Sequence, residues 1–164
     1  MDLIKIKEIA KTASEQNNCR VYDIFKHRDR LQVFIDKKNQ TVNLKDCENV
    51  FHSLRFLLHS ELPYLLEKNR LEVSSPGIEK QLREKWHFKE SIGQSINLTT
   101  NYPVKFKNEN KTFQTRSFIA DLISVSEDTL HLKKSQLKFS IPFSEVKTAK
   151  LIFNQKKLTK KRGK

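Results

Sequence analysis

Few side chains in this sequence have the types and spacings that support catalysis or metal binding. The 164 residues contain two cysteines and five histidines, and none of these belongs to a zinc-protease, phosphate-loop, dinucleotide-binding or serine-hydrolase motif. His52 and His59 are two helical turns apart and have no third ligand at zinc spacing. Glu127 and Asp128 fall in a turn pattern, where water would reach a general acid and base. We therefore expect no enzyme activity, no metal and no cofactor.

Two residues nevertheless leave an enzyme hypothesis open. Cys47 falls on the apolar face of a helical pattern, which favours a small buried hydrophobic residue over a nucleophile. His87 follows Trp86 and is interpreted as an aromatic contact. His27, in a predicted turn, and His131, in a predicted strand, have no evident partner in the sequence. An enzyme that uses Cys47 or His87 is therefore kept as one alternative.

Positive charge is the strongest chemical signal. The net charge is +13, but residues 1–90 carry 17 Lys and Arg against 14 Asp and Glu, whereas residues 91–164 carry 15 against 5. Such a field attracts polyanions, of which nucleic acid is the usual one, although a basic surface can also serve solubility or an anionic membrane face. Neither a GxxG loop nor an aromatic RNA-binding motif accompanies the charge. We therefore expect phosphate contacts rather than base stacking.

The candidate partner-binding residues form four groups. The first is the turn Ser74, Ser75, Pro76 and Gly77. The other three are basic: Lys105, Lys107 and Lys111 in one predicted loop, Lys133, Lys134 and Lys138 around one predicted hairpin, and Lys156, Lys157, Lys160, Lys161 and Arg162 in the tail.

The first half of the chain predicts an αββαβ domain. Apolar residues at helical spacing over 3–13 predict a helix, and two β-prone runs within 19–36 predict a hairpin. Asn43, with Asp46 three residues on, predicts the start of a long helix that Pro63 closes. A three-stranded sheet with both helices on one face best satisfies this order.

A short strand and turn then end this half of the sequence. Leu71 and Val73 alternate with polar residues, and Pro76 stops the strand. Gly77 follows where a type II turn needs a residue that tolerates positive φ. We therefore place the end of the N-terminal domain, residues 1–77, at this turn.

The second half predicts a different architecture. Residues 78–90 are highly charged and are interpreted as an interdomain linker, with Trp86 and Phe88 as apolar anchors. Over 91–153, five short segments alternate at period two, which favours a small closed β-barrel, with a single 3₁₀-type turn at residues 142–145. Residues 154–164 are too charged to bury and are expected to be a disordered tail. The predicted fold class is α+β.

The cellular setting follows from what the sequence lacks. The first residues alternate charged and apolar side chains without an uninterrupted apolar run, so we expect neither a secretory signal nor a membrane span. Cys19 and Cys47 have no disulfide-framework spacing. We expect a cytoplasmic monomer without a small-molecule substrate.

The seven residues that end the first half resemble the signature of the RimP family of bacterial ribosome maturation factors; they are Leu71-Glu72-Val73-Ser74-Ser75-Pro76-Gly77. Residues 31–36, Val42 and the Asp46-Cys47 helix start resemble that family's hairpin strand and helix in order and spacing. Residues 118–153 are similar to its C-terminal domain. The resemblance implies an N-terminal α/β domain followed by an SH3-like or Sm-like barrel.

The resemblance also implies a function. Members of the family are not enzymes; they bind the free small (30S) ribosomal subunit or its precursor, through ribosomal RNA and protein contacts. They assist a late assembly step that includes incorporation of the twelfth small-subunit protein. Two departures stand out: Ile78-Glu79-Lys80-Gln81-Leu82 lacks the family's Arg-Pro-Leu, and Phe118-Ile119-Ala120 lacks its strand glycine. The alternative from another class is a general RNA- or DNA-binding module whose affinity comes from charge alone.

Overall fold

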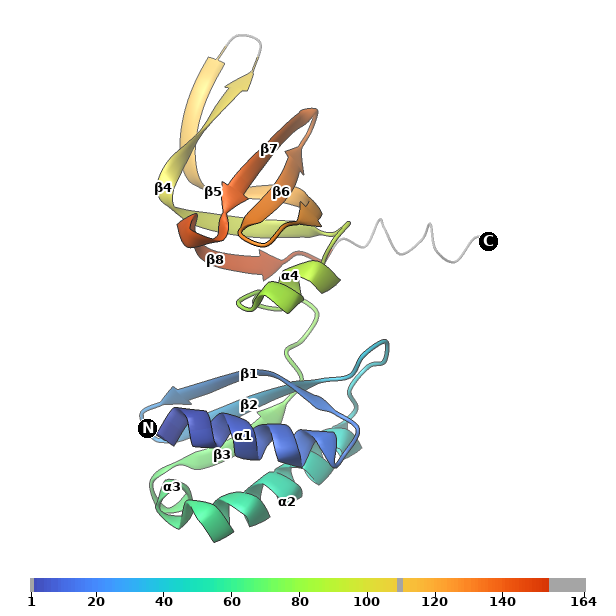
Figure 1. The fold of residues 1–164 in the computed structure, drawn as a ribbon, viewed down its shortest axis with the longest axis vertical. Helices are drawn as coiled ribbons and strands as arrows, with labels where there is room; N and C mark the ends of the chain where they lie inside the picture. The colour runs from blue at the N-terminus through green and yellow to red at the C-terminus, as the bar shows by residue number, and fades with distance from the viewer. Residues whose placement is uncertain (1, 109–110, 154–164) are drawn as a thin grey trace, which may run out of the picture. The chain divides into compact units, whose positions relative to one another are not determined.

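The computed structural model describes residues 2–108 and 111–153. The chain forms two compact units, with the boundary between Pro76 and Gly77 (Figure 1). Each unit has its own buried hydrophobic cluster. The predicted α+β class is confirmed.

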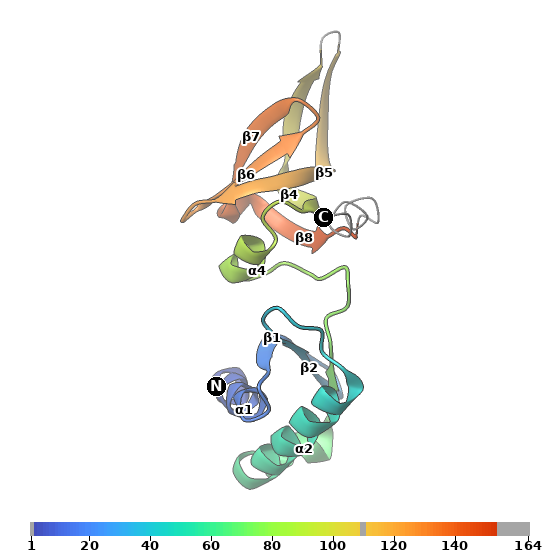
Figure 2. The same ribbon diagram turned by 90° about the vertical axis from the view of Figure 1, so that its right-hand side faces the viewer.

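The first unit contains the predicted αββαβ order with one additional helix. Its elements are α1 (Asp2–Glu15), β1 (Arg20–His27), β2 (Arg30–Asp36), α2 (Leu44–Glu61), α3 (Pro63–Lys68) and β3 (Arg70–Ser74). The sheet order is β1-β2-β3, with β1 antiparallel and β3 parallel to β2. Figure 2 shows α1 and α2 on the same face of this sheet, as the sequence predicts.

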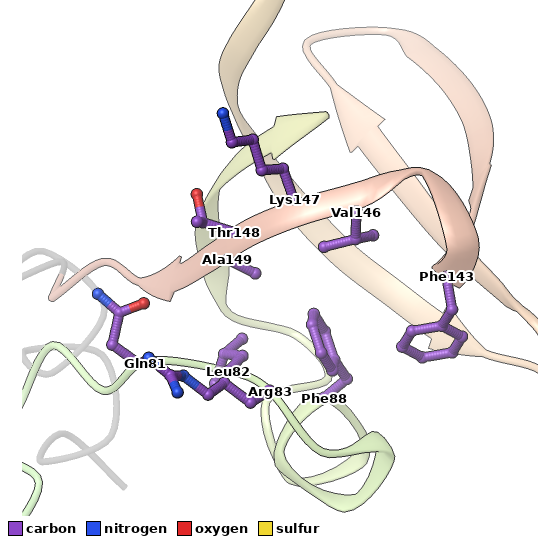
Figure 3. Close-up of a pocket in the computed structure, with 9 residues that line it drawn as sticks. All are labelled: Gln81, Leu82, Arg83, Phe88, Phe143, Val146, Lys147, Thr148 and Ala149. Carbon is purple, nitrogen blue, oxygen red and sulfur yellow. The ribbon is translucent and has the colours of Figure 1, made fainter. Parts of the chain in front are cut away.

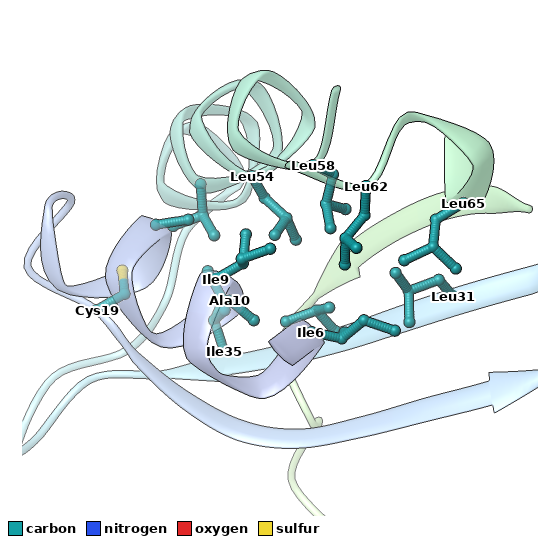
Figure 4. Close-up of a cluster of buried hydrophobic side chains, with 13 residues drawn as sticks. Ile6, Ile9, Ala10, Cys19, Leu31, Ile35, Leu54, Leu58, Leu62 and Leu65 are labelled. Carbon is teal, nitrogen blue, oxygen red and sulfur yellow. The ribbon is translucent and has the colours of Figure 1, made fainter. Parts of the chain in front are cut away.

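The core of the first unit lies between those two helices and the sheet (Figure 4). Along β2, Leu31, Val33 and Ile35 are at most 1% exposed, and they alternate with residues of the opposite face. From the helices, Ile6 and Leu54 are fully buried in the same cluster. The apolar residues that recur at strand spacing and those that recur at helical spacing therefore pack together in one layer.

The start of α2 follows the predicted capping box. The Asn43 Oδ1 atom accepts the Asp46 N–H at 2.9 Å, and the Asn43 N–H donates to Asp46 Oδ2 at 3.0 Å. Lys37 Nζ lies 2.6 Å from Asp46 Oδ1. Two backbone N–H groups at the start of the helix, which would otherwise lack a partner, are therefore hydrogen-bonded.

The prediction at Pro63 is only half right. Helix α2 ends at Glu61, but Pro63 is the first residue of α3 rather than the end of the helical region. Proline is tolerated there because the first N–H of a helix has no intrahelical partner. Leu62 and Leu65 are both buried, and they attach this second helix to the core.

The second unit is an antiparallel sheet with two short helices. Its elements are α4 (Lys85–Glu90), β4 (Ser95–Asn108), β5 (Lys111–Val125), β6 (Thr129–Lys134), β7 (Leu137–Pro142), η1 (Phe143–Glu145) and β8 (Val146–Leu151). The strand order is β7-β6-β5-β4-β8. Five strands and the 3₁₀ turn agree with the predictions.

Closure of this sheet into a barrel is not confirmed. Within the described residues, no ladder joins β7 to β8, so the five strands form an open sheet in hydrogen-bonding terms. The outer edge of β8 is instead covered by the chain near Gln81, which bridges to Lys150. The Leu82 N–H donates to the Ala149 carbonyl at 2.8 Å. A covered edge reduces the need for closure, and the sequence does not reveal that the chain near Gln81 covers β8.

The segment predicted as a linker, residues 78–90, differs from that expectation. Leu82 is 3% exposed and Phe88 is 1% exposed, and both belong to the core of the second unit. Phe88 packs edge-on against Phe143, with ring centroids 5.2 Å apart. Most of this segment is therefore part of the second unit.

Candidate nucleic-acid interface

The turn after β3 has the backbone that its sequence predicts. Gly77 has φ +77°, in the region that side chains disfavour, and an added Cβ would meet no atom within 4 Å. The restriction on this position is therefore conformational rather than steric. Ser74 and Ser75 are exposed, whereas Pro76 is half-buried. The hydroxyl groups of the two serines are accessible to a partner.

Both cysteines behave as parts of the first core. Burial raises the pKa of the Cys47 thiol, and the nearby Asp46 carboxylate acts in the same direction, while backbone hydrogen bonds at Cys47 and Ser75 oppose the change. Burial likewise raises the pKa of Cys19, and Lys37 opposes it. A protonated thiol is a weak nucleophile, so neither environment favours covalent chemistry.

His87 holds the start of α4. Its side chain is 2% exposed, and its Nδ1 atom accepts the N–H groups of Arg83 at 3.0 Å and Glu84 at 3.1 Å. The ring also contacts Trp86, with centroids 4.1 Å apart, as the sequence suggests. This histidine is therefore fully engaged in local structure.

His131 has partners that the sequence does not reveal. Its Nε2 atom lies 2.8 Å from Ser126 Oγ, and its Nδ1 atom lies 2.9 Å from Ser140 Oγ. Ser140 is directly opposite His131 on β7, and Ser126 comes from the turn before β6. The expectation that His131 lacks a partner is wrong, because strand pairing supplies one that sequence separation hides.

The three lysines of the β6–β7 hairpin separate onto two faces. Lys133 and Lys138 are directly opposite each other in the ladder. Lys134 belongs to the other face, where its Nζ atom lies 4.8 Å from the Phe106 ring centroid and 5.8 Å from that of Phe118. Two of the three lysines are therefore presented together to solvent, and the third contacts aromatic rings.

The aromatic rings beneath Lys134 form a three-membered cluster. Phe106, Phe118 and Phe139 meet edge-to-face, with centroids 5.1 to 5.6 Å apart. Phe106 and Phe118 are at most 5% exposed. The cluster joins β4, β5 and β7 by packing rather than by hydrogen bonds.

The residues predicted to share a loop lie in a long hairpin instead. Lys105 is opposite Gln114, and the backbone of Lys107 is opposite Thr112. Lys111 begins β5. Lys105 is exposed. The tail candidates Lys156, Lys157, Lys160, Lys161 and Arg162 lie outside the described residues.

A cavity of about 360 Å³ runs beside β8 in the second unit (Figure 3). Apolar side chains of Leu82, Phe88, Phe143 and Val146 line it, with Arg83 on the opposite wall from the strand. It contains no pair of groups suited to acid–base chemistry among these lining residues. The cavity is a surface groove beside a partly covered strand edge.

The part of the chain that the structure describes lacks two further features. Residues 2–108 and 111–153 contain no group of three or more His, Cys, Asp or Glu side chains placed to hold a metal ion. In the same residues, none of the helices combines the length and apolar character needed to cross a bilayer.

Comparison with known families identifies the first unit. Residues 9–79 match the family model of the RimP N-terminal domain. The matched range runs from within α1 through β3 and includes the whole Leu71–Gly77 signature and its positive-φ glycine. The resemblance on which the sequence prediction rests is thereby confirmed for this domain. The first unit of this chain is therefore similar to the N-terminal domain of the RimP family over residues 9–79.

Proposed function

We propose that this protein is a non-enzymatic maturation factor for the small ribosomal subunit. The observation that carries the proposal is the family match over residues 9–79, because RimP is a ribosome maturation family. The positive charge of residues 91–164 supports it, since ribosomal RNA is a polyanion. The factor acts in the cytoplasm as a monomer and uses no cofactor.

The proposal assigns different tasks to the two units. The second unit supplies affinity for ribosomal RNA through lysines such as Lys133 and Lys138, which are opposite each other in the β6–β7 ladder. The first unit provides recognition of the subunit or of one of its proteins, and its Ser74–Gly77 turn presents two exposed serines, Ser74 and Ser75. Binding is to the free subunit or its precursor.

Sedimentation of a cell lysate on a sucrose gradient tests this proposal. At moderate salt, the protein should comigrate with free small subunits and be absent from complete ribosomes. The same lysate treated with ribonuclease serves as the control, because the protein should then move to the top of the gradient. Distribution through every RNA-containing fraction, or a position at the top of the untreated gradient, would contradict the proposal.

The alternative of a general RNA binder makes a different prediction in that experiment. A binding module that depends on charge alone would follow total RNA, with large subunits and complete ribosomes included. Its binding would also fall with salt equally on all RNAs, since counterion release is independent of sequence. The cross-strand pairing of Lys133 with Lys138 on the β6–β7 hairpin is the observation that favours this alternative.

A further inference from the structure

The outer surface of the β6–β7 hairpin carries a compact group of polar side chains. Lys133 pairs with Lys138, and His131 pairs with Ser140, as two neighbouring cross-strand pairs. Side chains alternate along a strand, so these four residues share one face of the sheet. The intervening pair, Leu132 and Phe139, packs on the opposite face. We call these four residues, His131, Lys133, Lys138 and Ser140, the β6–β7 block.

The two lysines of the block form an unfavourable pair in the protein alone. Directly opposed side chains on antiparallel strands have Cβ atoms about 4.5–5.5 Å apart, and like charges in that position destabilise the sheet. Asp121 on β5 is directly opposite Lys133 on its other side and offsets part of this repulsion, but its carboxylate accepts the Ser95 hydroxyl at 2.5 Å, and Lys138 has no such neighbour in the ladder. Across the described residues, neither lysine is placed at ion-pair distance from a carboxylate. A bound anion would relieve this repulsion.

The histidine of the block determines the hydrogen-bonding role of a neighbouring hydroxyl, that of Ser140. A neutral imidazole has one donor and one acceptor nitrogen, so His131 donates to one serine and accepts from the other. When Nδ1 carries the proton, Ser140 accepts that bond and its own hydroxyl proton is available to another acceptor. Ser126 then donates to Nε2. An acceptor held beside Ser140 therefore selects this tautomer.

The chemistry of the block fits a phosphate better than a carboxylate. Peptide carboxylates are recognised best by the fork of an arginine, and the block has none. Lysine, serine and histidine donors are typical of contacts to nucleic-acid phosphates, which fix position without reading sequence. A tetrahedral anion between the two ammonium groups would also accept the Ser140 proton. We propose that the β6–β7 block binds a phosphate group of the RNA backbone; the identity of that RNA as ribosomal rests on the proposed function.

Lys134 does not belong to this site. Its ammonium group lies over the Phe106 and Phe118 rings on the opposite face of the hairpin. The phosphate site therefore uses two lysines of the hairpin and the residues across from them, and excludes the lysine between them in sequence. This separation of the three lysines onto two faces distinguishes a specific phosphate site from a surface that is basic throughout.

The first test measures the salt dependence of RNA binding. Polyuridylate is the probe, because it has phosphates but little structure, and the full chain is compared with Lys133→Gln/Lys138→Gln. The control, Lys26→Gln/Lys89→Gln, removes the same charge from two exposed lysines outside the block. The block variant should lower the slope of log K against log salt by about 0.7 for each lost single-strand contact. An equal change in both variants would overturn the proposal.

A second test follows the histidine ring directly. Adding inorganic phosphate to the ¹⁵N-labelled full chain should shift the Nδ1 and Nε2 resonances of His131, because one tautomer becomes favoured. Ser140→Ala should abolish that response and leave the backbone spectrum of the first unit unchanged. Unchanged His131 resonances in the native chain at phosphate concentrations that shift the Lys133 and Lys138 signals would remove His131 and Ser140 from the site.

These outcomes are separate from those of the proposed function. If the block variant loses RNA affinity selectively but the native protein does not follow small subunits, the phosphate site stands and the proposed function fails. If the native protein follows small subunits and the block variant binds polyuridylate with the native slope, the function stands and the phosphate site is wrong.

Discussion

The two units of this chain use charge in opposite ways. In the first unit, the charged groups of the core boundary are paired internally: Arg20 lies 3.0 Å from Asp36, and Lys37 lies 2.6 Å from Asp46, with both carboxylates at most 13% exposed. In the second unit, Lys133 is opposite Lys138 on β7, and Asp121 on β5 is its neighbour on the other side. Ion pairs within the protein stabilise the fold, whereas lysines that make no ion pair remain able to attract an external anion. The difference separates a scaffold that carries the family signature from a surface that we propose to bind an anion.

The largest expected effect tests whether the two cores are independent. Leu54→Ala removes a fully buried side chain from the first core and should cost that unit about 2–5 kcal/mol. Trp86, the only tryptophan, lies in the second unit and reports on it alone. Urea unfolding should therefore show an earlier transition by far-UV circular dichroism and an unchanged tryptophan transition.

Leu132→Ala is the matched variant for the other core. It removes an equally buried leucine of β6 and should shift the tryptophan transition instead. If Leu54→Ala shifts the tryptophan fluorescence midpoint as far as the circular dichroism midpoint, the units unfold together and the comparison fails.

The next effect concerns the turn that ends the first unit. Gly77→Val forces a β-branched residue to adopt φ +77° and should cost about 1–2 kcal/mol of stability. Gly77→Asn is the control, because asparagine visits this backbone region with less strain. Thermal unfolding of both variants checks the difference. Equal stability of Gly77→Val and the native chain would mean that the turn rearranges freely.

A smaller effect on the stability of the first unit is expected at acidic pH. Hydrogen bonds from the Asn43 backbone and from Lys37 hold the pKa of Asp46 below its ordinary value of 3.8. A carboxyl with a lowered pKa stabilises the folded state above its unfolded pKa, and that stability is lost as pH falls through the folded pKa. The first unit should therefore lose stability as the pH falls below about 3.8.

Comparison of Asp46→Asn with the native chain isolates this contribution. Urea midpoints measured against pH should fall less steeply for the variant on the acid side, because it has no proton to gain at this position. Asp29→Asn, which alters an exposed carboxyl in the β1–β2 turn, is the control. Parallel curves for the native chain and Asp46→Asn would show that the capping box has no linked proton.

Local sequence patterns predicted the parts of the fold that local chemistry determines. The capping box at Asn43, the positive φ of Gly77 and the five period-two strands all depend on residues close in sequence. Pro63 was misread because proline ends one helix and begins another equally well, and only the burial of Leu65 distinguishes the two.

Long-range contacts account for what the sequence missed. Leu82 lies between polar neighbours in a segment interpreted as a linker, so its burial in the second core depends on strands far along the chain, whereas Phe88 is an apolar anchor that the sequence predicts. The His131 network likewise depends on the β6–β7 register. At the candidate site, the sequence found Lys133 and Lys138, but it could not separate Lys134 from them without knowing which face each one occupies.

Binding of the purified full chain to purified ribosomal particles tests the central claim most directly. Free small subunits, large subunits and complete ribosomes are each incubated with the protein and excess polyuridylate, and the bound protein is measured after pelleting. The account predicts that small subunits retain the protein in the presence of this competitor, while the other two particles do not. Equal retention by all three particles, or complete loss to the competitor, would contradict it.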